Sequence, residues 1–272
     1  MDQLGIGYLS VFGLPPVEFV EVAAALECRF ISLFLRGGPL LPLGYPPFSL
    51  QRDHALRDSL GAALRHHGVT ITLADGFLVV PGGDVRGCAA DLDVVAELGI
   101  PRLNVVSLEN DLGRTFDEFA VLAELAAERG ISTVVEPVPG LAVSDVPTAL
   151  AAARHVGRPD FQLLIDTMHV SRTGCTPADL AAIDCGHIGY AQLNDTTRRP
   201  RSADYLEEAM YERLAPGDGE LPLRDIIRAL PTGLVIELEV PQRSLALAGV
   251  SPADRLRPCV EAARRVLTEA AG

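Results

Sequence analysis

The chain has 272 residues, of which 48% are hydrophobic and 22% are charged, as in an ordinary globular protein. Its formal net charge of −13 makes nucleic acid and anionic membrane surfaces poor partners, because both are themselves negative. All 23 basic residues are arginine, which excludes reactions that need a lysine amine, such as Schiff-base or pyridoxal phosphate chemistry.

The five cysteines are scattered and form no C-x-x-C pair, which is typical of a reducing compartment. The first residues include no basic segment of the kind that opens a secretory signal. No apolar run approaches the ~20 residues that a membrane-spanning helix needs. We therefore expect a cytoplasmic protein with no membrane partner.

Eight apolar, strand-like runs alternate with longer amphipathic stretches. Most of them start about 30 residues apart, which is the length of one strand–helix unit. The last interval is longer, so we expect an insertion between the seventh and eighth strands. The runs begin near Leu4, Phe30, Val69, Arg102, Ile131, Phe161, Ile188 and Leu234.

The stretches between the runs have apolar residues at helical spacing. Thr115 is followed three residues later by Glu118, a pattern that predicts a capping box at the start of a helix. Ser251 and Pro252 open the last helix, with proline at a position that helices tolerate. The clearest helices are predicted over residues 52–67, 84–98 and 115–129.

This alternation favours an α/β fold with a closed parallel sheet, the (β/α)₈ or TIM barrel. We expect residues 1–272 to form a single domain of this kind. An open, doubly wound sheet is the alternative, but no G-x-G-x-x-G motif follows the first run.

Four acidic or amide side chains end four successive runs: Glu136, Asp166, Gln192 and Glu239. The carboxyl ends of parallel barrel strands converge on one mouth, so these four could surround a single ion. Oxygen donors without a thiolate suit a hard divalent metal. Each residue alone could instead cap a helix or pair with an arginine, but four at matching positions favour a metal site.

Two further acidic residues bear on the same mouth. Glu237 lies two residues before Glu239 and therefore shares its face of the strand. We prefer Glu239 as the ligand because it is nearer the carboxyl end, and we expect Glu237 one layer deeper, paired with an arginine or shared with the metal. Asp75-Gly76, after the third run, adds to the mouth.

Several short motifs after residue 130 resemble the sugar phosphate isomerase/epimerase family of the xylose-isomerase-like TIM barrel superfamily. The resemblance implies a divalent metal, Mn²⁺ or Mg²⁺ or alternatively Co²⁺, held by Glu136, Asp166, Gln192 and Glu239. Family epimerases carry histidine where this chain has Gln192, whereas similar glutamine ligands occur in the dehydroshikimate dehydratase branch. The motifs are Asp166-Thr167-Met168-His169, Gln192-Leu193-Asn194-Asp195, Pro216-Gly217-Asp218-Gly219-Glu220 and Glu239-Val240-Pro241.

The resemblance implies an isomerase or epimerase of a sugar or sugar-derived polyhydroxy carbonyl compound, with Glu136 or Glu239 removing the proton beside the carbonyl. The alternative is a dehydratase of the 3-dehydroshikimate or inosose type, in which His169 helps a hydroxyl group to leave. His169 could instead hydrogen-bond a ligand carboxylate. A sugar-binding barrel without activity is a third reading.

Substrate contacts are expected from Arg213, which the resemblance places against substrate, and from Arg198 and Asn194. Arg198 belongs to an arginine cluster after the seventh strand, and arginine recognises carboxylate or phosphate, so an anionic substrate is favoured. The cluster could equally pair with the acidic residues of its own segment. Members of the superfamily are often dimers or tetramers, which leaves a homo-oligomer open.

Overall fold

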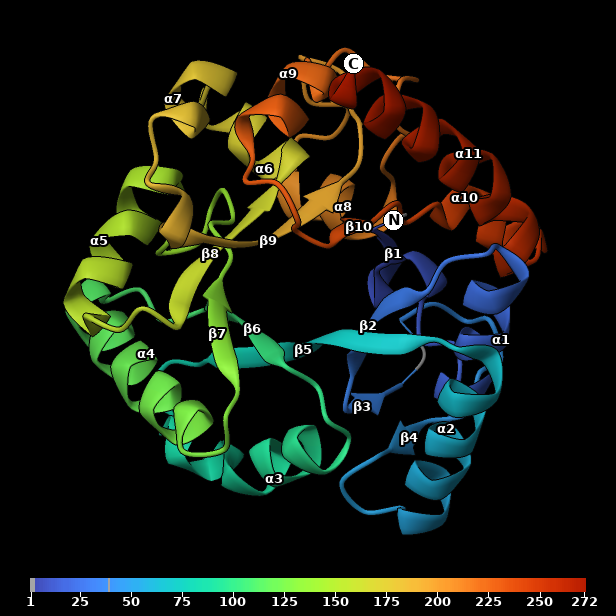
Figure 1. Ribbon diagram of the computed structural model, residues 1–272, viewed down its shortest axis with the longest axis horizontal. Helices are drawn as coiled ribbons and strands as arrows, with labels where there is room; N and C mark the ends of the chain where they lie inside the picture. The colour runs from blue at the N-terminus through green and yellow to red at the C-terminus, as the bar shows by residue number, and fades with distance from the viewer. Residues whose placement is uncertain (1–2, 39) are drawn as a thin grey trace.

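The computed structural model describes residues 3–38 and 40–272, and within them eight parallel strands close into a barrel (Figure 1). Around the ring the order is β1, β10, β9, β8, β7, β6, β5, β2, so the last strand pairs with the first. The (β/α)₈ fold is thus confirmed, while the extent of a single domain stays a prediction. The strands are β1 (Leu4–Ile6), β2 (Phe30–Phe34), β5 (Thr70–Val79), β6 (Arg102–Ser107), β7 (Ser132–Val135), β8 (Phe161–Asp166), β9 (Ile188–Leu193) and β10 (Ile236–Leu238).

Helices surround this ring in Figure 1. Ser251 caps the longest of them as predicted, since its side chain accepts a hydrogen bond from the Asp254 backbone N–H. No helix in the described part of the chain is both long and apolar enough to cross a membrane. The helices are α1 (Pro16–Ala25), α2 (His54–His67), α3 (Ala89–Glu97), α4 (Leu112–Ala127), α5 (Val146–Val156), α6 (Thr167–Arg172), α7 (Pro177–Ala181), α8 (Tyr205–Tyr211), α9 (Leu223–Ala229), α10 (Arg243–Leu247) and α11 (Pro252–Ala271).

The predicted capping box at Thr115 is wrong, because α4 begins three residues earlier. Asp111 is the N-cap residue, and its side chain accepts a hydrogen bond of 2.7 Å from the Arg114 backbone N–H. Thr115 lies inside the first turn, where its hydroxyl group bonds that of Ser107 at 2.8 Å. Aspartate caps a helix at least as well as threonine, and the local pattern could not choose between them.

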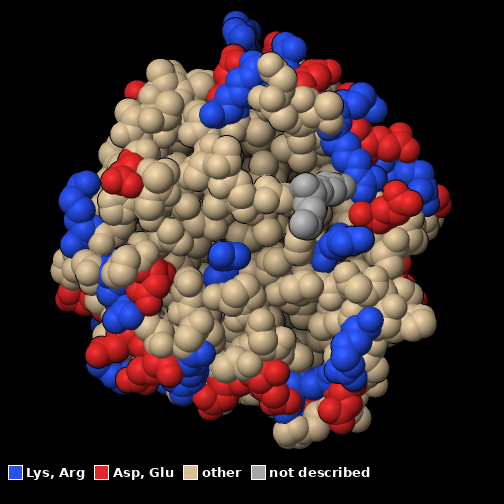
Figure 2. All heavy atoms as spheres, viewed as in Figure 1, with Lys and Arg blue, Asp and Glu red and all other residues tan. Residues whose placement is uncertain are grey.

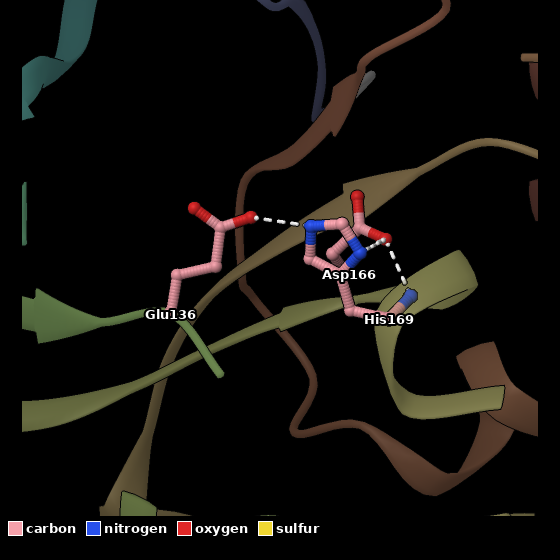
Figure 3. A group of neighbouring side chains, drawn as sticks. All are labelled: Glu136, Asp166 and His169. Carbon is pink, nitrogen blue, oxygen red and sulfur yellow. Dashed lines mark hydrogen bonds and ion pairs between the residues drawn. The ribbon is translucent and has the colours of Figure 1, made fainter. Parts of the chain in front are cut away.

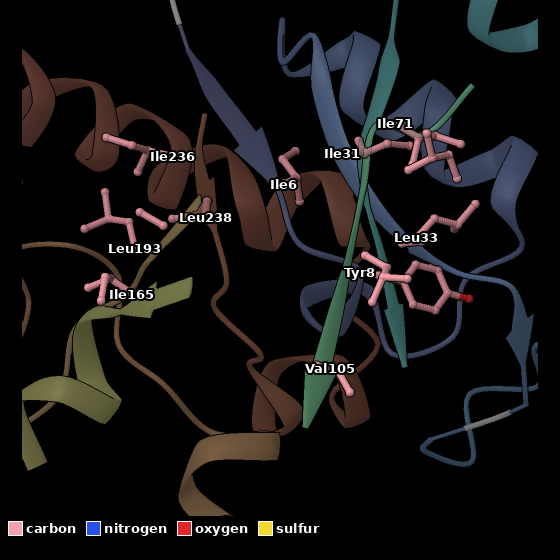
Figure 4. Close-up of a cluster of buried hydrophobic side chains, with 14 of the residues drawn as sticks. Ile6, Tyr8, Ile31, Leu33, Ile71, Val105, Ile165, Leu193, Ile236 and Leu238 are labelled. Carbon is pink, nitrogen blue, oxygen red and sulfur yellow. The ribbon is translucent and has the colours of Figure 1, made fainter. Parts of the chain in front are cut away.

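The strands bury apolar side chains on both faces. Outward-facing residues such as Ile165, Leu193 and Leu238 belong to the large core between the barrel and its helices (Figure 4). A second, smaller cluster consists of Leu73, Val134, Leu164 and Tyr190, which are all fully buried. Side chains alternate along a strand, so this cluster lies on the same strand faces as the acidic residues, one layer below them.

The third barrel strand continues further than the sequence suggested. Asp75-Gly76 was expected after this strand but lies within β5. The pairing of β5 with β6 shifts between Ala74 and Phe77, and Gly76 has a φ of 87°, which glycine adopts at low cost. This irregularity leaves Asp75 9% exposed beside the other acidic residues.

Two further features concern the surface. The expected insertion between β9 and β10 is present, and it contains α8 and α9. A two-stranded hairpin, β3 (Arg36–Gly37) with β4 (Phe48–Ser49), follows β2.

Despite the net charge of −13, Figure 2 shows acidic and basic side chains intermingled around the edge of one face rather than one acidic surface.

Candidate functional site

The candidate site occupies the carboxyl ends of the strands in the second half of the barrel. Asp166 ends β8, and the strand register places it beside Gln192, which is in turn beside Glu237. Glu239 lies two residues beyond Glu237, nearer the carboxyl end, as expected. Glu136 directly follows β7. The four predicted ligands therefore come from adjacent strands, as the sequence indicated.

Glu136, Asp166 and His169 form one buried group, in which potential metal-binding atoms lie within 4.8 Å of one another (Figure 3). Asp166 also caps α6, accepting a hydrogen bond of 2.9 Å from the His169 backbone N–H. This cap turns the His169 ring towards β7, where its Nε2 atom lies 3.2 Å from Glu136 Oε1. The predicted Asp-x-x-His motif thus places both side chains in one site.

Asp75, Glu237 and Glu239 form a second group of the same size. The amide nitrogen of Gln192 donates to Glu237 Oε1 at 3.2 Å and to Glu239 Oε1 at 3.1 Å. Gln192 therefore holds these two carboxylates beside each other.

Glu237 lies deeper than Glu239, as predicted, but its partner is not the arginine that we considered. Its carboxylate accepts hydrogen bonds from the Tyr190 hydroxyl group at 3.0 Å and from the Ser32 hydroxyl group at 3.1 Å. Tyr190 belongs to β9, which neighbours β10, whereas Ser32 belongs to β2, on the far side of β1. Hydroxyl groups thus take the place of a counter-charge.

Arg213 connects the two groups. It is 3% exposed, and its Nη1 atom lies 2.7 Å from Asp166 Oδ2 and 3.0 Å from Glu239 Oε2. Its Nε atom donates to the Ala209 carbonyl group at 2.7 Å. The sequence predicted that Arg213 contacts substrate; the structure shows it between two of the proposed ligands, and contact with substrate stays a prediction.

Two asparagines support the carboxylates. The Asn194 amide donates a hydrogen bond of 2.6 Å to Asp166 Oδ2. Asn194, which was predicted to bind substrate, therefore contacts one of the proposed metal ligands, and its contact with substrate stays a prediction. The Asn104 amide donates to Asp75 Oδ1 at 3.0 Å and to Glu136 Oε2 at 2.7 Å. Asn104 was not predicted from the sequence, although a polar residue within the apolar run of β6 was a signal for it.

The two groups together hold five carboxylates, and Arg213 lies between two of them, Asp166 and Glu239. The pKa values of the other two members of the second group are raised as well as that of Glu239. Burial and then the charge of Glu136 raise the pKa of Asp75 to about 7. Burial and then the charge of Asp75 raise the pKa of Glu237 to about 8. Burial also raises the pKa of Glu239 well above its ordinary value, although Arg213 is adjacent.

Asp166 differs from these three carboxylates in the direction of its pKa shift. Burial favours its protonated form, but the charges of Arg213 and His169 hold the pKa of Asp166 below its ordinary value. Asp166 is therefore better prepared than Asp75, Glu237 or Glu239 to act as an ionised ligand.

These residues fit a hard divalent cation. Buried carboxylates in excess need a cation or protons to offset the cost of burial. In addition, Gln192 Oε1 and Asn104 Oδ1 are buried and have no hydrogen-bond partner. Because a half-turn of an amide exchanges its oxygen and nitrogen, each could present an oxygen ligand to the cluster.

The arginine cluster after β9 lies at the surface. Arg198 is exposed, and its backbone N–H donates to Glu220 at 2.8 Å. Arg201 lies 3.5 Å from the buried carboxylate of Glu208, so part of this cluster pairs within its own segment. Contact of Arg198 with an anionic substrate stays a prediction.

Comparison with solved structures shows extensive likeness in fold. The IolI protein with a bound zinc atom has a TM-score of 0.75 and 15% identity, over 98% of this chain and 97% of that protein. D-Psicose 3-epimerase of Clostridium cellulolyticum H10 with D-tagatose has a TM-score of 0.71 and 14% identity, over 97% of this chain and 99% of that protein. The probable 3-DHS dehydratase AsbF of Bacillus anthracis has a TM-score of 0.71 and 13% identity, over 93% of this chain and 97% of that protein.

At these identities the likeness concerns the fold alone. Among curated proteins, none matches the sequence. The model of one protein family, however, matches residues 20–266, which is most of the chain. The chain belongs to the xylose isomerase-like TIM barrel family.

Proposed function

We propose that this protein is a divalent-metal-dependent isomerase or epimerase that acts on a sugar or a sugar-derived polyhydroxy carbonyl compound. The observation that carries the proposal is the concentration of buried carboxylates at one end of the barrel, with the ring of His169 set against Glu136. A D-psicose 3-epimerase of the same fold supports the reaction class.

The proposed ligands are Glu136, Asp166, Gln192 and Glu239. When bound, a divalent cation, Mn²⁺ or Mg²⁺ or alternatively Co²⁺, would stabilise the negative charge that develops on a substrate oxygen. The zinc atom in the IolI structure supports a metal in this fold. Arg213 and Asn194 hold Asp166 in place, so their contribution to substrate binding would act through this carboxylate.

Proton transfer is assigned to the carboxylates that reach the mouth. Glu136 and Glu239 are 8% and 5% exposed, whereas Asp166 is fully buried. Either glutamate can take the proton beside a substrate carbonyl group, and its return at the other face or carbon completes epimerisation or isomerisation. Arg198, exposed on the loop after β9, is the candidate contact for an anionic group.

A dehydratase of the 3-dehydroshikimate or inosose type is the second candidate. Two observations favour it. Gln192 supplies an amide where the resemblance expects the imidazole of an epimerase, and the His169 ring lies 3.2 Å from Glu136, beside the proposed base, where it would donate a proton to a leaving hydroxyl group. The probable 3-DHS dehydratase shares the fold. In both reactions the first step is proton removal by the same carboxylates.

The decisive experiment is incubation with Mn²⁺ in D₂O against ketoses, an inosose and 3-dehydroshikimate, followed by NMR. Deuterium in the recovered substrate or its epimer indicates an isomerase, and loss of water indicates a dehydratase. Glu136→Gln should abolish both, whereas Glu128→Gln, at an exposed helix end, should not. If the protein binds Mn²⁺ but neither change occurs with any of these compounds, it is a binding barrel and the proposal is wrong.

A further inference from the structure

The mouth of the barrel has a side that the proposed metal ligands do not occupy. Around the ring, β5 and β6 lie opposite β9 and β10, which carry Gln192 and lead to Glu239. β5 has 10 residues and is the longest of the eight barrel strands. Its last residues extend beyond Asp75 and beyond the shift in pairing with β6. The ends of β5 and β6 therefore border the mouth across from Gln192 and Glu239.

The contacts of β6 show which of its side chains face the mouth. The amide of Asn104 reaches two carboxylates of the candidate site, so Asn104 faces the mouth. Ser107 faces the helices instead, because its hydroxyl group bonds that of Thr115 in α4. Side chains alternate along a strand, so Val106 and Leu108 share the face of Asn104. Two apolar side chains thus follow Asn104 on the mouth side of β6.

The end of β5 adds two more apolar side chains to this face. Leu78 pairs with Val106, and the Leu108 backbone N–H donates to the Val79 carbonyl group at 2.8 Å, so the pairing continues past the end of β6. Paired residues of parallel strands point to the same face, which places Leu78 and Val80 towards the mouth. Val79 packs in the outer core between the barrel and its helices. The apolar wall, as we call this set, consists of Leu78, Val80, Val106 and Leu108.

The apolar wall is open to solvent and continuous with the candidate site. Leu78, Val80 and Leu108 are 42%, 42% and 43% exposed, and neighbouring apolar side chains that stay exposed commonly mark a binding surface. A cavity of about 320 Å³ is lined by Phe34, Asp75 and Leu78 among others, so it joins a carboxylate of the site to the wall. Its volume is within the range of small-molecule pockets.

The charged side chains at the edge of this cavity already have partners. Arg36 and Asp91 both line it and are ion-paired with each other. Asp75 accepts a hydrogen bond of 3.0 Å from the Asn104 amide. What this side of the mouth offers a ligand is therefore mainly apolar surface, whereas the opposite side offers carboxylate and amide groups.

We propose that the apolar wall is a substrate subsite that takes a hydrophobic substituent. The substrate is then a polyhydroxy carbonyl compound that carries an aryl or branched alkyl group. Its oxygen-rich end lies at the carboxylates and its substituent lies against the wall. This substrate class rests on the proposed function, which supplies the carbonyl end. A plain ketose fills only the polar side of the mouth.

The test compares phenyl and methyl β-D-xylopyranoside, which differ only in the apolar group, as ligands of the metal-free, full-length protein. NMR follows ¹³C-labelled leucine methyl groups, with the signals of Leu78 and Leu108 identified by their loss in Leu78→Asn and Leu108→Asn. The phenyl compound should shift both signals and bind about 10-fold more tightly than the methyl compound, because part of its ring leaves water. Each asparagine variant should lose this advantage. Leu247→Asn, at a 54% exposed leucine of α10, should keep it.

Unshifted Leu78 and Leu108 signals in the wild type, up to the solubility limit of the phenyl compound, overturn the subsite. Equal loss of affinity in Leu78→Asn and Leu247→Asn does the same. Sedimentation supplies a further check: self-association that Leu78→Asn and Leu108→Asn abolish would make the wall an interface between two copies of the chain, and the subsite would be wrong. The titration involves neither metal nor a reactive carbonyl group, so its failure is distinct from failure of the deuterium-exchange experiment, which tests the proposed function.

Discussion

The Gln192 amide lies between Glu237 and Glu239 and presents its nitrogen to both. Its oxygen is buried and has no partner. If a half-turn directs this oxygen to a cation, the site is built entirely of oxygen ligands, which favours Mn²⁺ or Mg²⁺ over Zn²⁺. In that arrangement, Gln192 would set the metal preference of the proposed site.

Gln192→His should shift preference towards Zn²⁺ or Co²⁺, because imidazole nitrogen suits these metals better than an amide oxygen does. Titration calorimetry of Zn²⁺ against Mn²⁺ measures the change. Gln162→His, near the opposite end of β8, is the matched control. Unchanged preference in Gln192→His would show that Gln192 is not a ligand.

Arg213 offsets the charge of Asp166 and Glu239 through one nitrogen. Arg213→Met should lower the free energy of unfolding of the metal-free protein by about 3–5 kcal/mol, because it leaves two buried carboxylates without this partner. Saturating Mn²⁺ should then raise the melting temperature more than it does in the wild type. Arg224→Met, at a surface pair with a 63% exposed arginine, is the control. If Mn²⁺ raises the melting temperature of Arg213→Met and of the wild type equally, Arg213 does not offset the charge of the metal ligands.

Some of these residues could be predicted from sequence, and others could not. Glu136 and Asp166 were identifiable because each ends an apolar run, where barrel strands open to the mouth. Asn104 and Tyr205 could not be placed, since their contacts with Glu136 and His169 depend on which neighbouring strand and helix they meet. Sequence periodicity gives the face of a strand but not its tertiary partners.

At the level of elements, the alternating pattern gave all eight strands, and the largest error in their starts is Leu234 predicted against Ile236 found. Local signals were less reliable. The capping box predicted at Thr115 was wrong, because Asp111, four residues earlier, caps α4. The bulge that keeps Asp75 within β5 depends on pairing with β6, which a single strand does not reveal.

The ion pair between Arg172 of α6 and Glu208 of α8 has a predictable dependence on pH. Burial opposes ionisation of Glu208, but hydrogen bonds from Thr196 and the Arg201 backbone, together with the charge of Arg172, hold the pKa of Glu208 below its ordinary value. A carboxyl whose pKa is lowered on folding stabilises the protein above its unfolded pKa, about 4.3 for glutamate, and this contribution is lost as pH falls through the folded value.

Glu208→Gln should therefore lower the melting temperature at neutral pH, and the difference from the wild type should shrink as the solution is acidified below about pH 4.3. Thermal melts across this range measure it. Glu207→Gln, on the same helix with a 41% exposed side chain, should show a much smaller effect at neutral pH. A difference that persists undiminished in acid would mean that the amide disturbs packing rather than charge.

Over the whole molecule, a bound cation should stabilise the folded state, since the unfolded chain cannot gather ligands from several strands. At a free Mn²⁺ concentration about 100 times Kd, the gain is about 2.7 kcal/mol. Asp166→Ala should lose this gain, whereas Asp117→Ala, with a 75% exposed side chain, should keep it. If EDTA-stripped and Mn²⁺-loaded wild-type protein have the same melting temperature, the proposed metal site is wrong.

The final strand, β10, pairs with both β9 and β1 and supplies Glu237, while Glu239 follows it directly. Without β10, the sheet would be open between β9 and β1, and the ligands of the earlier strands would lack Glu239. High-affinity ion capture at the proposed site must then await completion of the ring. Metal binding at the proposed site would therefore distinguish the complete barrel from a chain that ends before β10.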